Sequence, residues 1–457
     1  METEIHLSLG QRRFWALDKI DNVTSAYNMP LVFGIVGALD IGNLKKSLNF
    51  IIMRHEALRT LIRLDEAGVT KGILIPQVQI DEIFAYKDLT EEAGLKQKDR
   101  ELKVRTIIEK ESSKPFLLDD TPPIRFLLTK IKNLDYVLSV TFHHHASDGV
   151  SLDIFIKELN LTYQAYLNNQ EPNLTPLLIQ YSDWAAWHEK RLQKTIDGKL
   201  LRATERLKTA PQLLSLPLDK PRSSERARSA GYIPIQLSPN TAMNLRQLAQ
   251  RENTTLFNVA LAVFGCFLNR ISGQMSVVVG APVSGRDRSE IENVIGYFVN
   301  TVAFPIELAG HETVTDLMRH IKNVTQNILA DQDIPFERLV DELAHERSLE
   351  YSSIFQAMLS FQSSTQCALA LEGTDCQPYE LGLEATKFDL VLALEEKKNG
   401  DLVGFLEFDK DLFDSLNVRR WAKSFISLAD NFANSPNAPL ATLQILSSDE
   451  TKGIVEK

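Results

Sequence analysis

The chain has 457 residues, a length that predicts two or three compact units because typical domains have ~100 to 200 residues. Its 44% hydrophobic and 24% charged residues are typical of a globular protein with a large core. The formal net charge of -10 argues against a nucleic-acid partner, and no apolar run approaches the ~20 residues of a membrane span. The start also lacks the pattern of a signal peptide, so we expect a cytoplasmic protein with no membrane partner.

The first part of the chain alternates helical and strand patterns. Apolar residues recur at helical spacing from Asn43, which predicts a helix over 43–62. Residues 124–142 predict two strands joined by a tight polar turn at 132–135. In the second of these strands, alternate residues place three apolar side chains on one face: Leu138, Val140 and Phe142.

A second helix is expected directly after the strand pair. Its apolar stripe runs through the stretch from Ser151 to Leu167, and Ser151 is a candidate N-cap. Asn and Pro then accumulate in residues 166–177, which is typical of a surface connection. We therefore predict an α/β fold with a first domain at 1–175 and a second at 176–457.

The second half contains two further loops of interest. The stretch 215–231 is basic and rich in Ser and Pro, and we interpret it as a solvated loop, with docking of an acidic partner as the alternative. Residues 276–283 predict a buried strand that ends in a Gly/Ser loop. In that loop we expect Arg286, Asp287 and Arg288 to be solvated and to form surface pairs worth little.

Three consecutive histidines lie between the predicted strand and the second helix, in the stretch HHHASDG at 143–149. Neighbouring strand residues point to opposite faces, so His143, His144 and His145 cannot all converge on one ion if the strand continues. The other histidines show neither HxxxH nor HExxH spacing, and the cysteines form no CxxC pair. A metal site is therefore not expected.

Two readings of the histidines remain, a strand end with satisfied histidines and a catalytic turn. A neutral imidazole accepts a proton from an amine or hydroxyl near neutral pH, and His144 is our candidate. The backbone N–H of Gly149 begins the following helix, where it favours negative charge on an acyl oxygen. Asp148 is expected to pair with an arginine. With no Ser or Cys nucleophile motif nearby, direct transfer between two substrates is favoured over a covalent intermediate.

The same residues resemble a known family. HHHASDG at 143–149 is similar to the HHxxxDG signature of condensation domains of nonribosomal peptide synthetases, in the chloramphenicol acetyltransferase-like superfamily. Other stretches resemble the remaining family motifs in the family's order: LSLGQRRFWALDKI with YNMP (7–30), RHEALRT (54–60), YSDWAAW (181–187), IGYFVNT (295–301), DQDIPFERLVDEL (331–343) and RSLEYSSIFQAMLSFQ (347–362).

The resemblance implies a fold and a set of site residues. It implies two acetyltransferase-like lobes that form a V-shaped pseudo-dimer with an active-site tunnel between them. The second motif histidine, His144, takes the catalytic role and His143 a structural one. Asp148 pairs with an arginine of the second motif, for which Arg59 is the match. Asn300 reaches the channel from the second lobe.

The resemblance also implies substrates and partners. Donor and acceptor carrier proteins deliver acyl groups as thioesters on phosphopantetheine arms, with no permanently bound cofactor, and the acceptor amine attacks the donor thioester. Neighbouring adenylation or polyketide synthase modules are further expected partners, and the domain itself is expected to be a monomer. The sequence leaves open whether the chain is a free-standing enzyme or one domain of a longer synthetase.

Departures from the family patterns favour one subtype. GQRRFWALDKI resembles domains that take an L-configured or otherwise non-D donor, and IGYFVNT is similar to the fifth motif of condensation rather than epimerisation domains. The DxxxxD motif of heterocyclisation domains is absent. Two alternatives stay open: ester formation with a hydroxyl acceptor, and a noncatalytic module that recruits carrier proteins or tailoring enzymes. Whether His144 acts as a base or positions the amine is also open.

Overall fold

The computed structural model describes residues 2–20, 25–90, 97–223, 228–308, 313–343, 350–363, 367–379 and 386–446. Residues 224–227 of the predicted basic loop and 347–349 of the seventh motif-like stretch lie outside the described residues. Contacts divide the chain into two compact units. Unit 1 comprises Met1–Lys194, Ser284–Val299 and Thr365–Gly382, and unit 2 comprises Thr195–Val283, Asn300–Ser364 and Leu383–Lys457.

These units are not separated by a single cut in the sequence. Residues 176–194, which the sequence assigned to the second domain, pack with unit 1, and two later segments return to it. The division into two acetyltransferase-like lobes at residue 175 therefore stays a prediction about the family fold, and the contact pattern describes the physical units.

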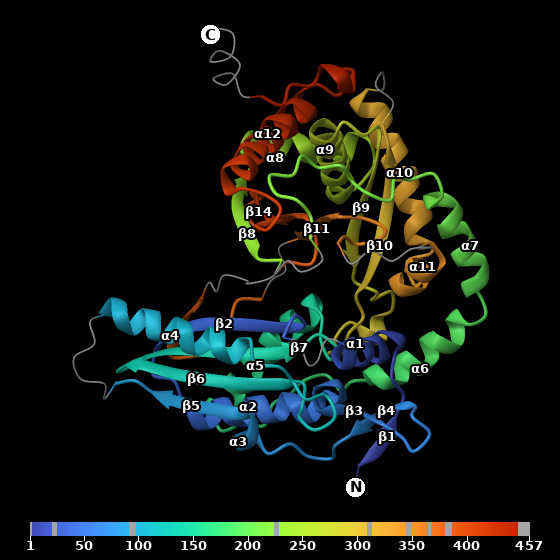
Figure 1. Cartoon of the computed structure of the whole chain (residues 1–457). Helices are drawn as coiled ribbons and strands as arrows, with labels where there is room; N and C mark the ends of the chain where they lie inside the picture. The colour runs from blue at the N-terminus through green and yellow to red at the C-terminus, as the bar shows by residue number, and fades with distance from the viewer. Residues whose placement is uncertain are drawn as a thin grey trace. The chain divides into compact units, whose positions relative to one another are not determined.

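Unit 1 is built around a five-stranded sheet with the order β12-β2-β7-β6-β5, beside a small sheet with the order β1-β4-β3 (Figure 1). Its strands are β1 (Thr3–Ile5), β2 (Asn28–Gly37), β3 (Thr60–Leu64), β4 (Thr70–Leu74), β5 (Phe84–Asp88), β6 (Ile124–Lys132), β7 (Asp135–His143) and β12 (Thr374–Pro378). Its helices are α1 (Leu9–Ile20), α2 (Ile41–Arg54), α3 (Ile80–Ile83), α4 (Gln97–Ser112), α5 (Gly149–Leu167) and α6 (Tyr181–Leu192), with short 3-10 turns at Glu56–Arg59 and Ser289–Ile291.

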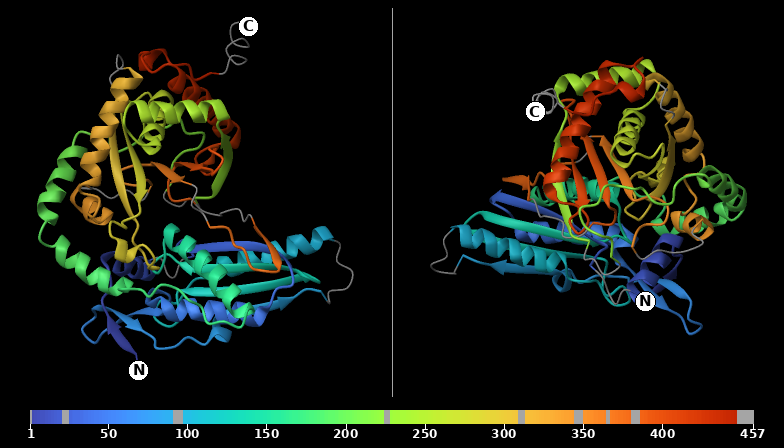
Figure 2. Two further views of the ribbon diagram at one scale, coloured as in Figure 1. Left: turned by 180° about the vertical axis from the view of Figure 1, so that it is seen from behind. Right: turned by 45° about the horizontal axis from the view of Figure 1, so that its top comes forward.

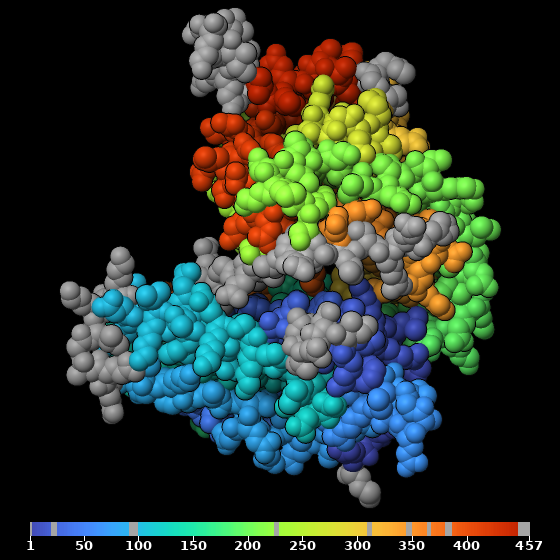
Figure 3. Space-filling model, in the orientation of Figure 1, coloured from blue at the N-terminus to red at the C-terminus, as the bar shows by residue number. Residues whose placement is uncertain are grey.

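The large sheet of unit 1 is covered on both faces. Leu138, Val140 and Phe142 of β7 share one face, as predicted, and belong to the core formed with α2 and α5. Val137, on the opposite face, packs with residues of α4. The outer face of α4 remains exposed, as the space-filling view shows (Figure 3). Buried side chains from α2, α5 and the strands hold the layers together by the usual burial of apolar surface.

The two predicted strands and the second helix are confirmed, whereas the first helix is shorter than expected. Helix α2 begins after Asp40, whose side chain caps the Asn43 amide, and ends at Arg54. The predicted stretch then continues as a 3-10 turn and as β3, which pairs antiparallel with β4. The β-branched residues Thr60 and Ile62 suit this strand, and its pairing outweighs the helical spacing of the apolar residues.

Unit 2 contains a six-stranded sheet with the order β10-β9-β11-β13-β14-β8 (Figure 2). Its strands are β8 (Ala230–Gln236), β9 (Ser276–Val283), β10 (Asn300–Glu307), β11 (Ala357–Ser363), β13 (Leu390–Glu396) and β14 (Leu402–Asp409). Its helices are α7 (Ile196–Leu207), α8 (Pro239–Arg251), α9 (Leu256–Ser272), α10 (Val314–Leu329), α11 (Phe336–Leu343) and α12 (Ser415–Asn434), with a 3-10 turn at Leu440–Thr442.

The main core of unit 2 lies between this sheet and helices α8, α9, α10 and α12. Helix α9 is the most deeply buried of them, with eleven consecutive buried residues from Asn258 to Leu268. Helices α7 and α11 form a second, smaller core with β9 and β10. Among the described residues no single helix has the length and apolarity for a membrane span, and only the bent pair α8 and α9, at 110°, passes that test together.

Candidate active site

The histidine run is the turn that joins the end of β7 to the start of α5, as the sequence predicts. β7 ends at His143 and α5 begins at Gly149. The N-cap of α5 is Asp148, whose side chain accepts from the Ser151 amide at 2.8 Å. Ser151 is therefore not the cap: it occupies the first helical turn, because the aspartate side chain reaches the free amides there.

His143 and His145 lie on the buried side of the turn and face each other. Their Nδ1 atoms are 2.9 Å apart, and His143 Nδ1 also accepts from the His145 amide at 3.2 Å. Because His143 Nδ1 is thus an acceptor, His145 Nδ1 carries the hydrogen between them. Burial lowers the pKa of His145 to about 4, with a partial offset from the Thr60 backbone, so this ring is neutral at pH 7. These contacts fit the structural role predicted for His143.

His144 points to the other side of the turn and is only half-buried. Its Nδ1 lies 2.9 Å from the Ser147 carbonyl oxygen. A carbonyl oxygen can only accept, so Nδ1 bears the hydrogen in this contact and the neutral ring has its basic lone pair on Nε2. The ring stacks on Phe14 at 5.6 Å and meets Tyr297 edge-on at 5.1 Å between centroids. Among the three histidines, His144 has the exposure and the tautomer that general-base chemistry requires.

Gly149 lies beside His144 at the first position of α5 and is exposed. A side-chain carbon at Gly149 would meet no atom within 4 Å, so the space next to the helix N-terminus is open. A helix N-terminus favours negative charge, which fits the predicted contribution of the Gly149 amide. That contribution stays a prediction.

The structure pairs Asp148 with Arg286, not with Arg59 as predicted. Arg286 Nη2 lies 3.1 Å from Asp148 Oδ1, and the two side chains are 5% and 2% exposed. Asp148 Oδ2 accepts from the Phe298 amide at 3.0 Å, and the Arg286 guanidinium stacks on the Phe298 ring. The expectation that Arg286 is solvated was therefore also wrong.

Arg59 instead serves the backbone around it. Its Nη1 donates to the Ile75 carbonyl at 2.9 Å and its Nη2 to that of Met53 at 3.4 Å, with Glu56 3.9 Å away. Burial lowers the pKa of the Arg59 guanidinium, with a partial offset from Glu56. Arg59 follows α2 in the chain, and its side chain joins this turn to the end of β4. Within the described part of the chain, these two carbonyl groups engage Arg59 where the sequence placed Asp148.

Sequence reasoning missed Arg286, although one signal for it exists. A buried aspartate requires a cationic partner, and Arg286 follows a predicted strand end, where loops carry functional groups. The sequence offers many arginines in loops, however, and 138 positions separate Arg286 from Asp148. Only the path of the chain selects among them.

Asn300 begins β10 in unit 2, and its amide is engaged by the loop that precedes α11. Its Nδ2 donates to the carbonyl oxygens of Gln332 and Ile334, and its Oδ1 accepts from the Phe336 amide at 3.2 Å. Asn300 thus joins two stretches that the sequence analysis singled out, IGYFVNT and DQDIPFERL. Its predicted place in a substrate channel stays a prediction.

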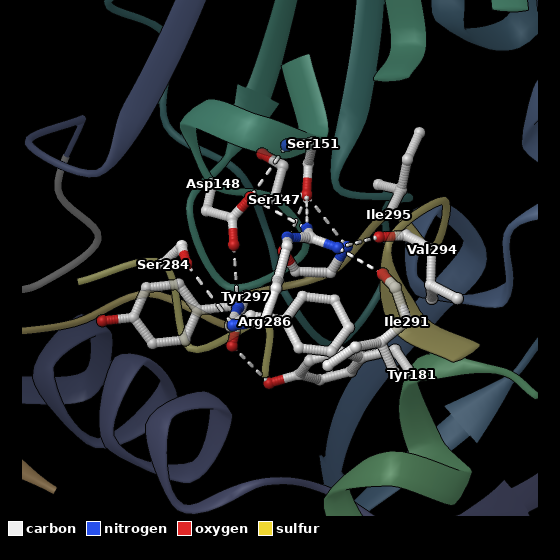
Figure 4. Close-up of polar contacts among 12 residues, drawn as sticks. Ser147, Asp148, Ser151, Tyr181, Ser284, Arg286, Ile291, Val294, Ile295 and Tyr297 are labelled. Atoms are coloured by element: carbon white, nitrogen blue, oxygen red, sulfur yellow. Dashed lines mark hydrogen bonds and ion pairs between the residues drawn. The ribbon is translucent and has the colours of Figure 1, made fainter. Parts of the chain in front are cut away.

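The described residues contain no group of three or more His, Cys, Asp or Glu side chains arranged to hold a metal ion. The nearest approach to a ligand set is the pair His143 and His145, whose facing nitrogens already contact each other. What the turn offers chemically is one basic imidazole nitrogen beside an open helix N-terminus. The supporting ion pair is shown in Figure 4.

Comparisons with known proteins agree with this description. The family model of the Condensation domain matches residues 1–455. The chain is 34% identical over 457 residues to part of the linear gramicidin synthase of Brevibacillus parabrevis, and 31% identical over 462 residues to surfactin synthase subunit 1 of Bacillus subtilis. The matches cover 99% and 98% of this chain but only 6% and 12% of those synthase polypeptides.

Solved structures share the fold. The X-domain in its complex with OxyB, from teicoplanin biosynthesis, matches with a TM-score of 0.85 and 23% identity, covering 98% of this chain and 97% of that one. The first condensation domain of the calcium-dependent antibiotic synthetase, in complex with a substrate analogue, matches with a TM-score of 0.79 and 17% identity, covering 97% and 100%. The predicted acetyltransferase-like α/β fold is thereby confirmed. The chain belongs to the condensation domain family of nonribosomal peptide synthetases.

Proposed function

We propose that this domain forms an amide bond between two carrier-bound substrates. The amine of the acceptor attacks the carbonyl carbon of the donor thioester, the carbon–sulfur bond breaks, and the thiol of the donor phosphopantetheine arm leaves. The proton lost by the amine balances the thiolate formed on the leaving arm. Relatives that belong to gramicidin and surfactin synthases support this class of reaction.

One observation carries the proposal: the tautomer of His144. Because the Ser147 carbonyl holds the hydrogen on Nδ1, the basic lone pair lies on Nε2, where it can accept a proton from the attacking amine or orient that amine. The exposed Gly149 at the N-terminus of α5 provides a field that favours negative charge on the thioester oxygen. His143, Asp148 and Arg286 hold this turn and do not need to touch the substrate.

The finer features of the proposal concern donor and partners. The first motif supports an L-configured or other non-D donor, and two carrier proteins are the partners that deliver the arms. A hydroxyl acceptor would use the same lone pair on His144, so ester formation is the narrower alternative. We expect no permanently bound cofactor, since the phosphopantetheine arms are parts of the substrates.

A noncatalytic recruitment role is the second candidate. It is favoured by the likeness to the X-domain, whose structure was solved in complex with OxyB. Such a module binds its partners without needing His144. The two candidates therefore make opposite predictions for a His144 variant.

Intact-mass analysis of the acceptor carrier separates these candidates. A donor carrier loaded with an acyl group and an acceptor carrier loaded with an aminoacyl group are mixed with the wild-type domain, with His144→Ala, or with His320→Ala. His320 on α10 serves as the matched control, because it lies outside the histidine turn. We expect the condensed mass with the wild type and with His320→Ala, and a loss of roughly 100-fold or more with His144→Ala.

Two other results would count against amide formation by His144. Equal product with His144→Ala would exclude its proposed role. No product from several donor and acceptor pairs, while both carriers bind the domain in a pull-down, would favour the recruitment role. Replacing the aminoacyl acceptor by a hydroxyacyl acceptor tests the ester variant in the same assay.

A further inference from the structure

The segment 295–298 of unit 1 has an unusual set of partners: side chains bind its backbone groups one after another (Figure 4). Loops normally leave such groups to water. The Ser151 hydroxyl accepts from the Gly296 amide at 3.1 Å and lies 2.8 Å from the Gly296 carbonyl oxygen. It also lies 2.7 Å from Asp148 Oδ1, so its single hydrogen goes to one of these two oxygens. Ser151 is fully buried.

The next two residues are bound in the same way. The Tyr297 carbonyl accepts from the Tyr181 hydroxyl at 2.7 Å, and the Phe298 amide donates to Asp148 Oδ2 at 3.0 Å. Tyr181 is 2% exposed, and its hydroxyl also lies 2.9 Å from the Ser8 hydroxyl. Helix α6 and the start of α5 therefore hold the segment from two sides.

The segment is also fixed at its beginning. The Ile295 amide donates to Nδ1 of His55, a fully buried residue at the end of α2, at 3.2 Å. His55 Nε2 in turn contacts Glu158 at 2.8 Å, and Glu158 accepts from Arg54 at 2.9 Å. Because Nδ1 accepts from the amide, Nε2 donates to the carboxylate.

Arg286 completes the arrangement from the preceding turn. Its Nη1 donates to the carbonyl groups of Ile291 and Val294 at 2.7 and 2.8 Å, and its Nη2 reaches Ser151 at 2.9 Å and Asp148 at 3.1 Å. The ion pair thus folds the chain between Arg286 and Val294 around one guanidinium. The backbone of 295–298 is left with little freedom relative to the N-terminus of α5.

The side chain that this backbone presents is Tyr297. Its ring meets His144 at 5.1 Å and 87°, and meets Phe14 at 4.9 Å and 80°. A side-chain carbon at Gly10 would lie 2.6 Å from the Tyr297 ring, so α1 provides room for this ring by having glycine there. Phe14 lies against one face of His144, and Tyr297 stands perpendicular to it.

We propose that Tyr297 is a positioning residue for His144 and that Ser151 acts on His144 through the backbone of 295–298. With Phe14 on its face and Tyr297 at its side, the imidazole cannot rotate away from the Ser147 carbonyl. The hydrogen then stays on Nδ1 and the lone pair on Nε2. The importance of this tautomer for catalysis rests on the proposed function, but the tautomer itself does not.

Two substitutions of Tyr297 test the role of its ring. Tyr297→Leu removes the aromatic ring, and Tyr297→Phe keeps it. The tautomer of His144 is read in the free domain from two-bond proton–nitrogen couplings in histidine labelled with nitrogen-15, with His144→Gln used to assign the signals. We expect the Nδ1–H tautomer in the wild type and in Tyr297→Phe, and a mixture of tautomers in Tyr297→Leu.

Ser151→Ala tests the connection through the backbone. Its matched control is Ser47→Ala, because Ser47 is equally buried but its hydroxyl donates to the Asn43 carbonyl of its own helix. We expect a mixture of tautomers in Ser151→Ala and none in Ser47→Ala. Should Ser151→Ala fail to fold, as judged by near-ultraviolet circular dichroism, Tyr181→Phe removes one bond to the same segment and is tested in its place.

The transfer assay then links position to rate. At saturating acceptor carrier, Tyr297→Leu and Ser151→Ala should react roughly 10 to 100-fold more slowly, because a small misplacement of a reacting group has effects of this size. The acceptor concentration at half-maximal rate should not change, and Tyr297→Phe should recover at least about half of the rate.

The outcomes are separable. An unchanged tautomer in Tyr297→Leu would overturn the proposal, and an unchanged tautomer in Ser151→Ala would remove Ser151 from it. If the wild type itself transfers nothing, the proposed function fails while the tautomer measurement still decides the positioning role. A loss of rate in Tyr297→Leu with a wild-type tautomer would also count against positioning.

Discussion

At the scale of single residues, the candidate site depends on buried polar groups with defined partners. Asp148 and Arg286 are both almost fully buried, and each satisfies several other groups in addition to its partner. A buried ion pair is weak evidence for stability as a whole, but the loss of one member leaves an uncompensated charge. The pair is therefore a sensitive point of unit 1.

Substitution of one member of this pair should destabilise the protein strongly. Arg286→Met leaves Asp148 buried without a counter-charge, and we expect the free energy of unfolding to fall by about 3–5 kcal/mol in urea titrations. The control is Arg319→Ala on α10, whose pair with Asp316 is exposed and should contribute about 0–1 kcal/mol. Similar losses in the two variants would contradict the structural role assigned to Arg286.

His145 predicts a pH dependence of stability. Its pKa is about 4 in the folded chain, below the ordinary 6.5, so the unfolded chain binds a proton between these values that the folded chain does not. The contribution is fully present above pH 6.5, is lost as the pH falls toward 4, and amounts to roughly 3 kcal/mol.

Urea titrations from pH 7 to pH 4 measure this effect. His145→Gln should be less stable than the wild type at pH 7, with a shallower decline toward pH 4. The decline should not vanish, because burial also lowers the pKa of His55 despite the opposing effect of Glu158. Parallel curves for wild type and variant would show that His145 is not the titrating group.

At the scale of elements, one strand reaches unit 1 from far along the chain. β12 pairs antiparallel with β2 over five residues and forms the edge of the five-stranded sheet. Asn160 of α5 holds the chain before it, donating to the Ala368 carbonyl at 2.9 Å and accepting from the Ala370 amide at 2.8 Å. The amide side chain thereby takes the place of a neighbouring strand for these two backbone groups.

Loss of this contact should loosen the segment before β12 without unfolding the unit. Asn160→Ala removes two hydrogen bonds of about 1 kcal/mol each, so we expect amide exchange in 367–379 to be roughly tenfold faster or more. Hydrogen-exchange mass spectrometry measures this against Asn168→Ala, whose side chain donates to Gln164 of the same helix. Equal protection in the two variants would show that Asn160 does not hold the segment.

At the scale of the whole molecule, the chain passes repeatedly between two compact units. Unit 1 needs segments from three parts of the sequence, and unit 2 likewise. Each unit has its own large apolar core. A continuous piece of the sequence therefore does not contain all of the contacts of either unit.

This arrangement predicts the behaviour of a fragment that ends at residue 175, the expected domain boundary. Residues 1–175 lack Arg286 and β12, so Asp148 would be buried without its partner and the edge of β2 would be unpaired. We expect no cooperative thermal unfolding of this fragment by circular dichroism, in contrast to the full chain. A sharp transition in the fragment would show that the first 175 residues fold independently.

The local features of this protein could be predicted from its sequence. The alternation of β7, the turn at the histidines and the helix after it all follow from periodicity and from the preferences of neighbouring residues, which act over a few positions. The choice of His144 also follows from the motif, and the matching family model covers residues 1–455. Even here the capping residue was misplaced, because Ser and Asp both suit an N-cap and only the backbone decides which does so.

What the tertiary structure alone decided are the partners that lie far apart in the chain. The sequence indicated that Asp148 requires an arginine, but the nearby motif favoured Arg59, whereas the fold brings Arg286 to it from 138 positions away. The same loop brings Tyr297 against His144, and a later segment brings β12 against β2. Spacing in a sequence reports which side chains share a face of one element, while the pairing of buried charges and strand edges depends on how separate elements pack, which no local pattern contains.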